Sequence, residues 1–243
     1  MGIVVQKFGG SSVENTEKLF NICKYITEEH DNNNKVVVVV SAQGNTTDNL
    51  IKEAKEISED IDKREQDVLI SIGEQITIAK LAMCLKKLGY NAISLTGWQV
   101  PIKTNNQYGD ADILKINLDR IIKELNENKI VIVAGFQGIN EENNDITTLG
   151  RGGSDTTAVA LAAALQAEKC DIYKDVDGIY NMDPKINKRA FKYNTISYDE
   201  MLHLSNNGAK VLHNKSVKLA KEFNMPIHIK SIYNENSNGT YIL

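Results

Sequence analysis

The stretch Val36-Val37-Val38-Val39-Val40-Ser41-Ala42 decides the fold, because five consecutive valines carry no polar alternation. β-Branched residues favour strands, and a strand with no polar face is typical of a sheet that is buried on both sides. Such strands lie inside parallel sheets whose two faces are covered by helices. We therefore place this run in the centre of a mostly parallel sheet.

Shorter β-branched runs recur along the chain and are separated by segments with helical periodicity. We expect further strands at residues 3–5, 91–95, 130–134, 171–173 and 227–230. Helices are expected at residues 13–29, 65–88, 118–126, 155–167, 198–204 and 215–223. Such alternation predicts an α/β fold, namely a three-layer α/β/α sandwich with a mostly parallel open sheet. Residues 98–104 are interpreted as a hairpin flap over a site.

Length and composition favour a single domain, residues 1–243, with a small-molecule partner. A chain of 243 residues with 42% hydrophobic and 25% charged residues is typical of one soluble globular domain. The net charge of -4 argues against a nucleic-acid partner, which favours a basic surface. The longest apolar run, residues 36–40, is far shorter than a membrane span. Cys23, Cys84 and Cys170 form no metal-binding pair and indicate buried thiols in the cytoplasm.

Lys7-Phe8-Gly9-Gly10-Ser11-Ser12 follows the first expected strand and precedes a helix. Glycines allow backbone N–H groups to approach phosphate oxygens, while the helix N-terminus and Lys7 add positive charge. The segment therefore suits a phosphate group. Alternatively, the lysine and the glycines form only a structural turn.

A second glycine-rich segment, Gly150-Arg151-Gly152-Gly153-Ser154-Asp155, leads into an alanine-rich helix. Its glycines leave N–H donors free at the helix start, and Arg151 offers a planar fork for a carboxylate. In the simpler interpretation, Ser154 or Asp155 merely caps the helix.

A third segment is the acidic loop that runs from Lys174 to Lys185 after an expected strand. In open α/β sheets ligands bind at the carboxyl ends of strands, so an adenosine pocket is one interpretation and a solvated turn is the other. Weaker signals are Ser41 to Thr47, Glu74 in a helical stretch, and residues 208–213, where His213 is interpreted as a helix-start residue.

The segments together resemble the catalytic domain of aspartokinases, over the whole chain and in the same order. They read KFGGSSV from Lys7, SAQGNTTD from Ser41, LGRGGSDTT from Leu149, DVDGIYNMDP from Asp175 and GAKVLH from Gly208. The resemblance implies the amino acid kinase fold, with the acceptor toward the N-terminal half and ATP toward the C-terminal half. It implies ATP- and Mg²⁺-dependent phosphorylation of the side-chain carboxylate of L-aspartate, in the biosynthesis of lysine and threonine. It also implies a homodimer, with or without a separate regulatory subunit.

The same resemblance assigns roles to individual residues. Lys7 and Asp155 would be catalytic, with Asp155 organising the charged centre rather than acting as a base. The positions that would bind aspartate are Ser41, Thr47, Glu74, Arg151 and Gly152. Those that would bind the nucleotide are Lys7, Gly9, Gly10, Ser11, Lys174, Asp175, Tyr180, Asp183, Lys185 and Lys210. No protein residue is expected to bind a metal directly, because magnesium would rest on ATP oxygens and water.

Four positions depart from the usual aspartokinase pattern. Ser11 replaces Thr, Lys174 replaces Thr or Ser, Lys185 replaces Arg, and Asn214 replaces Pro. The two lysines change the donors beside the nucleotide, which leaves the preference for ATP over GTP open. Two rival functions remain: a kinase of the same fold for glutamate, acetylglutamate, carbamate or a nucleoside monophosphate, and a non-catalytic binding homologue.

The end of the chain carries one further expectation. Aspartokinases continue beyond a Gly-Thr pair into ACT domains, whereas three residues follow Gly239-Thr240 here. Allosteric control requires a second ligand site. We therefore expect that this chain alone is not feedback-inhibited by lysine or threonine at concentrations well below those that compete with aspartate, and calorimetry with either amino acid tests this.

Overall fold

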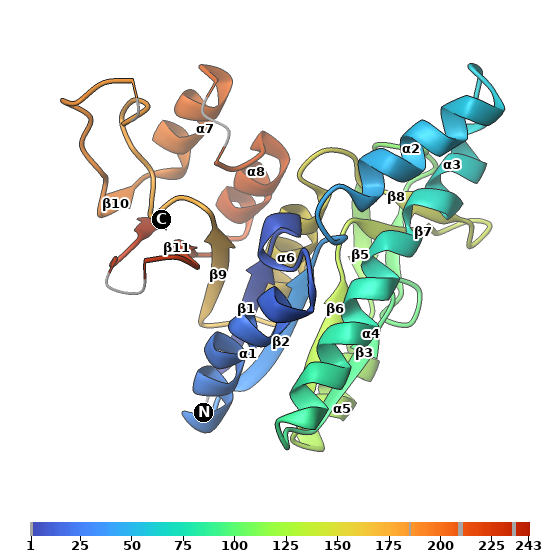
Figure 1. The fold of residues 1–243 in the computed structure, drawn as a ribbon, viewed down its shortest axis with the longest axis horizontal. Helices are drawn as coiled ribbons and strands as arrows, with labels where there is room; N and C mark the ends of the chain where they lie inside the picture. Colours follow the sequence, from blue (N-terminus) through green and yellow to red (C-terminus); the bar gives the residue numbers. More distant parts are fainter. Residues whose placement is uncertain (1, 185, 209–210, 235–236) are drawn as a thin grey trace.

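The computed structural model describes residues 2–184, 186–208, 211–234 and 237–243. Its main sheet has eight strands in the order β10-β12-β11-β9-β1-β2-β6-β3 (Figure 1). Neighbouring strands are parallel except for β11 and β12. The strands are β1 (Ile3–Phe8), β2 (Lys35–Val40), β3 (Ala92–Leu95), β6 (Ile130–Ala134), β9 (Lys169–Lys174), β10 (Thr195–Ile196), β11 (Ile227–Ser231) and β12 (Thr240–Ile242). The mostly parallel sheet is therefore confirmed.

The valine strand β2 lies inside this sheet, between β1 and β6. Alternate side chains of β2 point to opposite faces and enter two separate cores. Val36, Val38 and Val40 pack with α1 (Thr16–Asp31) and α4 (Ile72–Lys87). Val37 and Val39 pack in the core that contains α5, α6, α7 and α8. Helices on both faces make the three-layer sandwich that the sequence predicts.

The second helical layer covers the other face of the main sheet, and one of its helices begins at the candidate site. It consists of α5 (Asp119–Asn126), α6 (Gly153–Ala164), α7 (Tyr198–Asn206) and α8 (Asn214–Glu222). Residues 153–162 of α6 are all buried. Small alanine side chains let this helix lie close to the sheet and to α8, which fixes the position of its first turn.

The single helix predicted at residues 65–88 is wrong, because it is divided at Ser71 into α3 (Lys63–Ile70) and α4. The hydroxyl of Ser71 donates to the carbonyl of Val68 at 2.8 Å, a local bond that competes with helical hydrogen bonding. In addition, Nε2 of Gln137 donates to the Ser71 carbonyl at 2.8 Å. Ser71 is thus the N-cap residue from which α4 begins, and its carbonyl is also contacted by a residue distant in sequence.

Several elements are absent from the expectations: α2 (Thr46–Ile57), the strands β10 and β12 of the main sheet, and a second sheet of four strands. The second sheet has the order β5-β4-β7-β8. Its strands are β4 (Ile102–Thr104), β5 (Ile113–Ile116), β7 (Gln137–Asn140) and β8 (Ile146–Thr148). The hairpin expected at residues 98–104 forms later in the sequence, between β4 and β5. Figure 1 shows this sheet beside α2 and α3, away from α7 and α8.

The segment Lys63–Lys87, which spans α3 and α4, is long and apolar enough to cross a membrane by length and composition alone. However, 56% of its most apolar window is buried inside the structure. Ile78, Leu81 and Leu85 of α4 belong to the core beneath the sheet. We therefore interpret the segment as core helices.

Candidate active site

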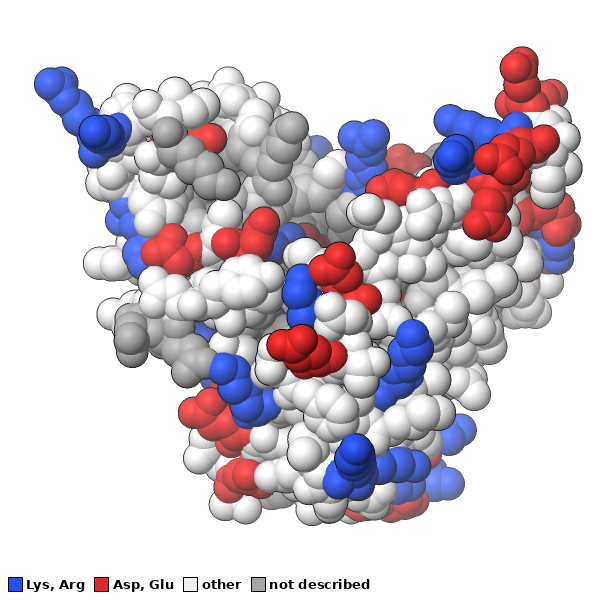
Figure 2. Space-filling model, in the orientation of Figure 1, with Lys and Arg blue, Asp and Glu red and all other residues white. Residues whose placement is uncertain are grey.

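The carboxyl ends of β1, β2 and β9 lie at one edge of the main sheet, because Phe8 is in register with both Val40 and Tyr173. The loops that follow these strands and the first turn of α6 enclose a cavity of about 580 Å³. The outline in Figure 2 dips in this region, between the part carrying α7 and α8 and the projecting end of α2. The predicted site residues that line the cavity are Lys7, Gly10, Ser41, Thr47, Glu74, Arg151, Gly152, Asp155 and Lys174.

Asp155 is the centre of the charged groups in this cavity. Its Oδ1 lies 2.6 Å from Nζ of Lys7, and its Oδ2 lies 2.7 Å from Nζ of Lys174. Burial of the carboxyl opposes ionisation, but the charges and hydrogen bonds of the two lysines outweigh burial and lower its pKa to about 2. Asp155 is therefore a carboxylate that holds two cations in fixed positions.

Lys7 is the penultimate residue of strand β1. Its side chain reaches this centre and is almost completely buried. Burial lowers the pKa of Lys7, and the nearby charge of Lys174 acts in the same direction, whereas Asp155 raises it. Contact with the carboxylate of Asp155 favours the charged form of the ammonium group. The side chain of Lys7 thus places a buried positive charge, partly compensated by Asp155, at the end of the cavity.

The turn after β1 packs tightly against the turn after β2. A Cβ atom on Gly10 would lie 2.9 Å from the carbonyl oxygen of Ala42, so only glycine fits there. The carbonyl of Gly10 accepts a hydrogen bond of 3.0 Å from the backbone N–H of Gly44. Gly9 lies beside Lys7, since a Cβ atom on it would be 3.5 Å from the lysine nitrogen. Backbone groups of both turns are thereby held near the charged centre.

Glu74 lies in the first turn of α4 and is buried. Its Oε1 accepts a hydrogen bond of 2.9 Å from the backbone N–H of Ala42, whereas its buried Oε2 has no partner among the described residues. Burial raises the pKa of Glu74 to about 7, against the opposing effects of the Ala42 N–H and Lys7. A carboxylate with one free oxygen in a cavity is suited to a ligand that carries an ammonium group.

Arg151 lines the same cavity from an exposed turn before α6. Gly150 and Gly152 flank it with φ angles of 71° and 72°, in the left-handed region that favours glycine. The N-cap of α6 is Gly152, and no side chain caps this helix. The interpretation of Ser154 or Asp155 as a cap is therefore wrong, and the guanidinium of Arg151 remains available to a carboxylate.

A second cavity of about 390 Å³ adjoins the first and shares Gly152, Asp155 and Lys174 with it. Its other lining residues come from the end of α7 and the start of α8, and they are Ser205, Gly208, Val211, Leu212, His213 and Asn214. His213 is the N-cap of α8, which confirms its interpretation as a helix-start residue. In the sequence, only the GAKVLH segment that begins at Gly208 indicated a binding site in this region.

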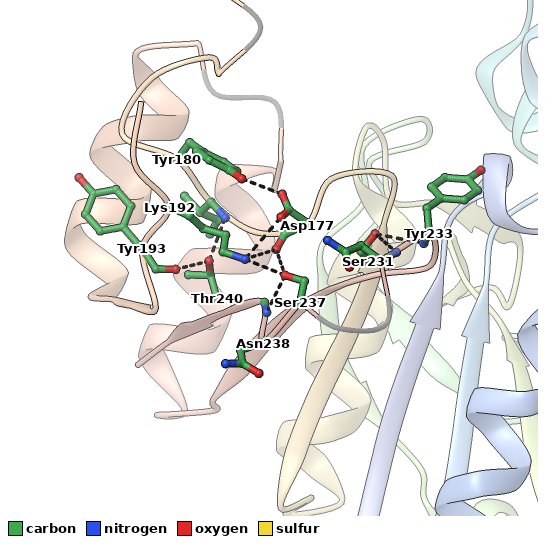
Figure 3. A network of polar contacts seen from close by, with 12 residues as sticks. Asp177, Tyr180, Lys192, Tyr193, Ser231, Tyr233, Ser237, Asn238 and Thr240 are labelled. Carbon is green, nitrogen blue, oxygen red and sulfur yellow. Dashed lines mark hydrogen bonds and ion pairs between the residues drawn. The ribbon is translucent and has the colours of Figure 1, made fainter. Parts of the chain in front are cut away.

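Gly9, Ser11, Asp175, Tyr180 and Asp183, the other predicted nucleotide residues that the structure describes, line neither cavity. Ser11, Asp175 and Asp183 are exposed, and Lys185 and Lys210 lie outside the described residues. The hydroxyl of Tyr180 donates to Oδ1 of Asp177 at 2.9 Å (Figure 3).

A network of polar contacts fixes the loop that carries Tyr180. The ammonium group of Lys192 lies 3.4 Å from Oδ2 of Asp177 and 2.7 Å from the hydroxyl of Ser237. The buried hydroxyl of Thr240 accepts from the N–H of Ile179 at 2.9 Å and donates to a backbone carbonyl. Figure 3 shows these side chains converging from the loop and from the chain that leads into β12.

Comparison with known proteins places this geometry in a family. The sequence model of the amino acid kinase family matches residues 2–231. The chain belongs to the amino acid kinase family. It is 56% identical to an aspartokinase of Bacillus sp. (strain MGA3) over 242 residues, which cover all of this chain and 58% of that relative. The chain thus spans about three-fifths of the length of such relatives.

Two solved structures are similar to this member of the amino acid kinase family over 99% of its length. The crystal structure of aspartate kinase from Synechocystis has a TM-score of 0.88 and 44% identity, and this chain covers 39% of it. The structure of E. coli aspartokinase III in complex with aspartate and ADP has a TM-score of 0.86 and 26% identity, with 64% of that chain covered. The expected kinase fold is confirmed.

The cavity also contains residues that the sequence analysis missed, among them Gln66, Ile70, Gly109, Phe136 and Thr148. Most come from α3 and the second sheet, which the sequence analysis did not identify as parts of the site. Asp67 lies behind them and is buried. An acidic residue just before the apolar run Val68-Leu69-Ile70 does not by itself indicate a buried contact, because aspartate is mostly exposed in proteins.

Proposed function

We propose that this chain transfers a phosphoryl group from ATP to the side-chain carboxylate of L-aspartate, giving 4-phospho-L-aspartate, the first step of aspartate-family amino acid biosynthesis. One observation carries the proposal: two adjoining cavities share the centre formed by Asp155 and Lys174. Similarity to aspartokinases, including one solved with aspartate and ADP, supports this assignment.

The larger cavity is proposed to bind aspartate. Two of its charged side chains, Glu74 and Arg151, complement the ammonium and α-carboxylate groups of an amino acid. Ser41 and Thr47 add hydroxyl groups, and Gly152 adds backbone at the boundary with the second cavity. A bound aspartate would then direct its side-chain carboxylate toward Lys7 and Asp155.

The smaller cavity and the turn after β1 are proposed to bind the nucleotide. Gly9, Gly10 and Ser11 would provide backbone N–H groups to phosphate, and Lys7 and Lys174 would provide charge. For the rest of the nucleotide we retain the predicted residues Asp175, Tyr180, Asp183, Lys185 and Lys210. Asp175 follows the end of β9 directly, and the contact of Tyr180 with Asp177 supports an ordered loop there.

The proposed chemistry needs positioning and charge rather than a general base. The carboxylate of aspartate has a pKa of about 4, so it is ionised at neutral pH. The carboxylate of Asp155 forms ion pairs with Lys7 and Lys174. It would hold their ammonium groups where negative charge develops during phosphoryl transfer. Each carboxylate oxygen of Asp155 thus contacts a lysine. The described residues contain no group of three His, Cys, Asp or Glu side chains that could hold a metal ion. These residues fit a magnesium ion carried by the phosphates of ATP, which when bound neutralises phosphate charge.

Further parts of the proposal rest on the resemblance to aspartokinases. They are a cytoplasmic location, a role in lysine and threonine biosynthesis, a homodimer with or without a regulatory subunit, and a single catalytic domain over residues 1–243. ATP and Mg²⁺ are the proposed cosubstrate and cofactor, and neither nucleic acid nor membrane is a proposed partner.

An ADP-release assay across acceptors tests the proposal. The purified chain is supplied with MgATP and, in turn, with aspartate, glutamate, acetylglutamate, carbamate or a nucleoside monophosphate. We expect ADP release with aspartate, together with trapping of the acyl phosphate by hydroxylamine. Faster release with another acceptor would favour a different kinase of this fold, and no release with any acceptor would favour a binding homologue. Repeating the assay with GTP determines the nucleotide preference.

A further inference from the structure

Asp67 is a buried carboxylate that the proposed chemistry does not use. It belongs to α3 and is only 1% exposed. Its Oδ2 accepts hydrogen bonds from the backbone N–H groups of Gly109 at 2.9 Å and Thr148 at 2.8 Å. Its Oδ1 accepts a bond of 2.7 Å from the hydroxyl of Thr148. Three donors from two distant segments thus converge on one side chain.

Both partners of Asp67 line the larger cavity. Gly109 lies in the loop between β4 and β5, while Thr148 ends β8 and leads through Leu149 and Gly150 to Arg151. Gly150 packs against the Gly109 loop, since a Cβ atom on it would lie 2.5 Å from Oδ1 of Asp110. Fixing these two segments therefore fixes the start of the arginine turn.

We infer that Asp67 is a positioning residue for the acceptor side of the cavity. It holds the Gly109 loop and the Thr148 end of β8 against α3, so that Arg151 is presented to the acceptor carboxylate. The inference rests on the proposed function and adds a residue to it. Because Asp67 touches only the acceptor side, its loss is expected to weaken acceptor binding while leaving nucleotide binding intact.

The variant Asp67→Asn distinguishes a positioning role of this side chain from an effect of its negative charge. In Asp67→Asn, the carbonyl oxygen of the amide can accept both backbone N–H groups. Its NH₂ group can donate to the hydroxyl of Thr148, which also accepts hydrogen bonds. Asp67→Ala instead leaves the N–H groups of Gly109 and Thr148 without this acceptor. Thr148→Val removes only the bond to Oδ1.

Asp145 provides a matched control because it joins the same two parts of the structure away from the cavity. Its carboxylate accepts from Arg64 of α3 at 3.1 Å and from the hydroxyl of Tyr108 at 2.9 Å. None of these three residues lines the cavity. Asp145→Ala therefore loosens the contact between α3 and the second sheet without removing a contact to a cavity residue.

The test compares steady-state kinetics of the four variants with the wild type, with ADP affinity measured by calorimetry. We expect Asp67→Ala to raise KM for the acceptor about tenfold, Thr148→Val to raise it less, and Asp67→Asn and Asp145→Ala to change it less than about twofold. ADP affinity should stay within about twofold throughout. If Asp67→Ala does not fold, the Asp67→Asn and Thr148→Val comparison carries the test.

Two outcomes would overturn the inference alone: equal effects of Asp145→Ala and Asp67→Ala, or an unchanged acceptor KM in both Asp67→Ala and Thr148→Val. If the wild type prefers another acceptor, the identity of the acceptor is refuted, and the same comparison made with that acceptor still tests Asp67. No turnover with any acceptor refutes the proposed function together with this inference.

Discussion

Lys174 contacts Asp155 at 2.7 Å, on the carboxylate oxygen opposite the one that Lys7 contacts. The resemblance to aspartokinases places Thr or Ser at this position, so the second cation is a departure from the usual pattern. Lys174 also lines both cavities. The charged centre of this chain therefore has two lysines on one carboxylate.

Replacing Lys174 with Thr should affect the nucleotide more than the acceptor. We expect Lys174→Thr to weaken ADP binding about tenfold, because one positive charge near the phosphates is lost, while KM for aspartate changes less than about threefold. Calorimetry with ADP measures the first effect. Lys169→Thr is the control, since Lys169 lies at the other end of β9 in contact with Glu29 and Asp171. Equal losses in both variants would rule out a specific role.

Removing either member of the Lys7 and Asp155 pair should impair turnover. We expect Lys7→Ala and Asp155→Ala to lower kcat on the order of 100-fold, because the positive charge of Lys7 stabilises the transition state more than the bound substrates and Asp155 holds that charge in place. Stopped assays at saturating substrate measure kcat, and circular dichroism checks folding. Losses below about tenfold in both variants would be incompatible with the proposed roles.

The pKa of Glu74, raised to about 7 by burial, predicts a pH-dependent affinity for aspartate. The ionised carboxylate attracts an ammonium group and the protonated form does not, so affinity is present above pH 7 and is lost as pH falls. KM for aspartate should rise about tenfold between pH 8 and pH 6, with kcat less affected. In Glu74→Gln, KM should be high and nearly independent of pH. A parallel slope in both proteins would assign the titration to another group.

The hydrogen bond between Thr240 and Ile179 predicts how substitutions of Thr240 change the free energy of unfolding, at a position away from the acceptor site. Thr240→Val keeps the shape of the side chain but leaves the N–H of Ile179 without its acceptor, so we expect a loss of about 1–3 kcal/mol in the free energy of unfolding. Thr240→Ser keeps the hydroxyl and loses one methyl group, for about 1 kcal/mol. Urea unfolding measures both. A smaller loss in Thr240→Val than in Thr240→Ser would contradict the importance of this hydrogen bond.

Six of the eight strands of the main sheet were predictable because their signal is local, whereas the short strands β10 and β12 were not predicted. Five valines in a row indicate a strand buried on both faces, and the strand and helix alternation then fixes the layers. The break at Ser71 was not predictable from periodicity, because it coincides with a bond from the Ser71 hydroxyl to the Val68 carbonyl and with a contact from Gln137, 66 residues away. Likewise, the short strands of the second sheet become recognisable only through their pairing.

The candidate site was partly predictable for a similar reason. Glycines and charges in turns after strands indicated the segments that contain Lys7, Arg151 and Asp155, and the structure brings these segments together. Nothing in the local sequence indicates that Lys174 pairs with Asp155. Asp67 escaped attention because its partners, Gly109 and Thr148, are ordinary loop and strand residues until the fold places them around it.

Gly152 lies on the boundary between the two cavities, and a Cβ atom there would come within 2.4 Å of Cβ of His213. The two cavities thus meet at the backbone of Gly152, and Asp155 and Lys174 line both of them. With the proposed function, we expect donor and acceptor to meet directly in a ternary complex, without a phosphorylated enzyme between them. Initial-rate plots should therefore intersect rather than run parallel, and a chiral γ-phosphoryl group should be transferred with inversion at phosphorus.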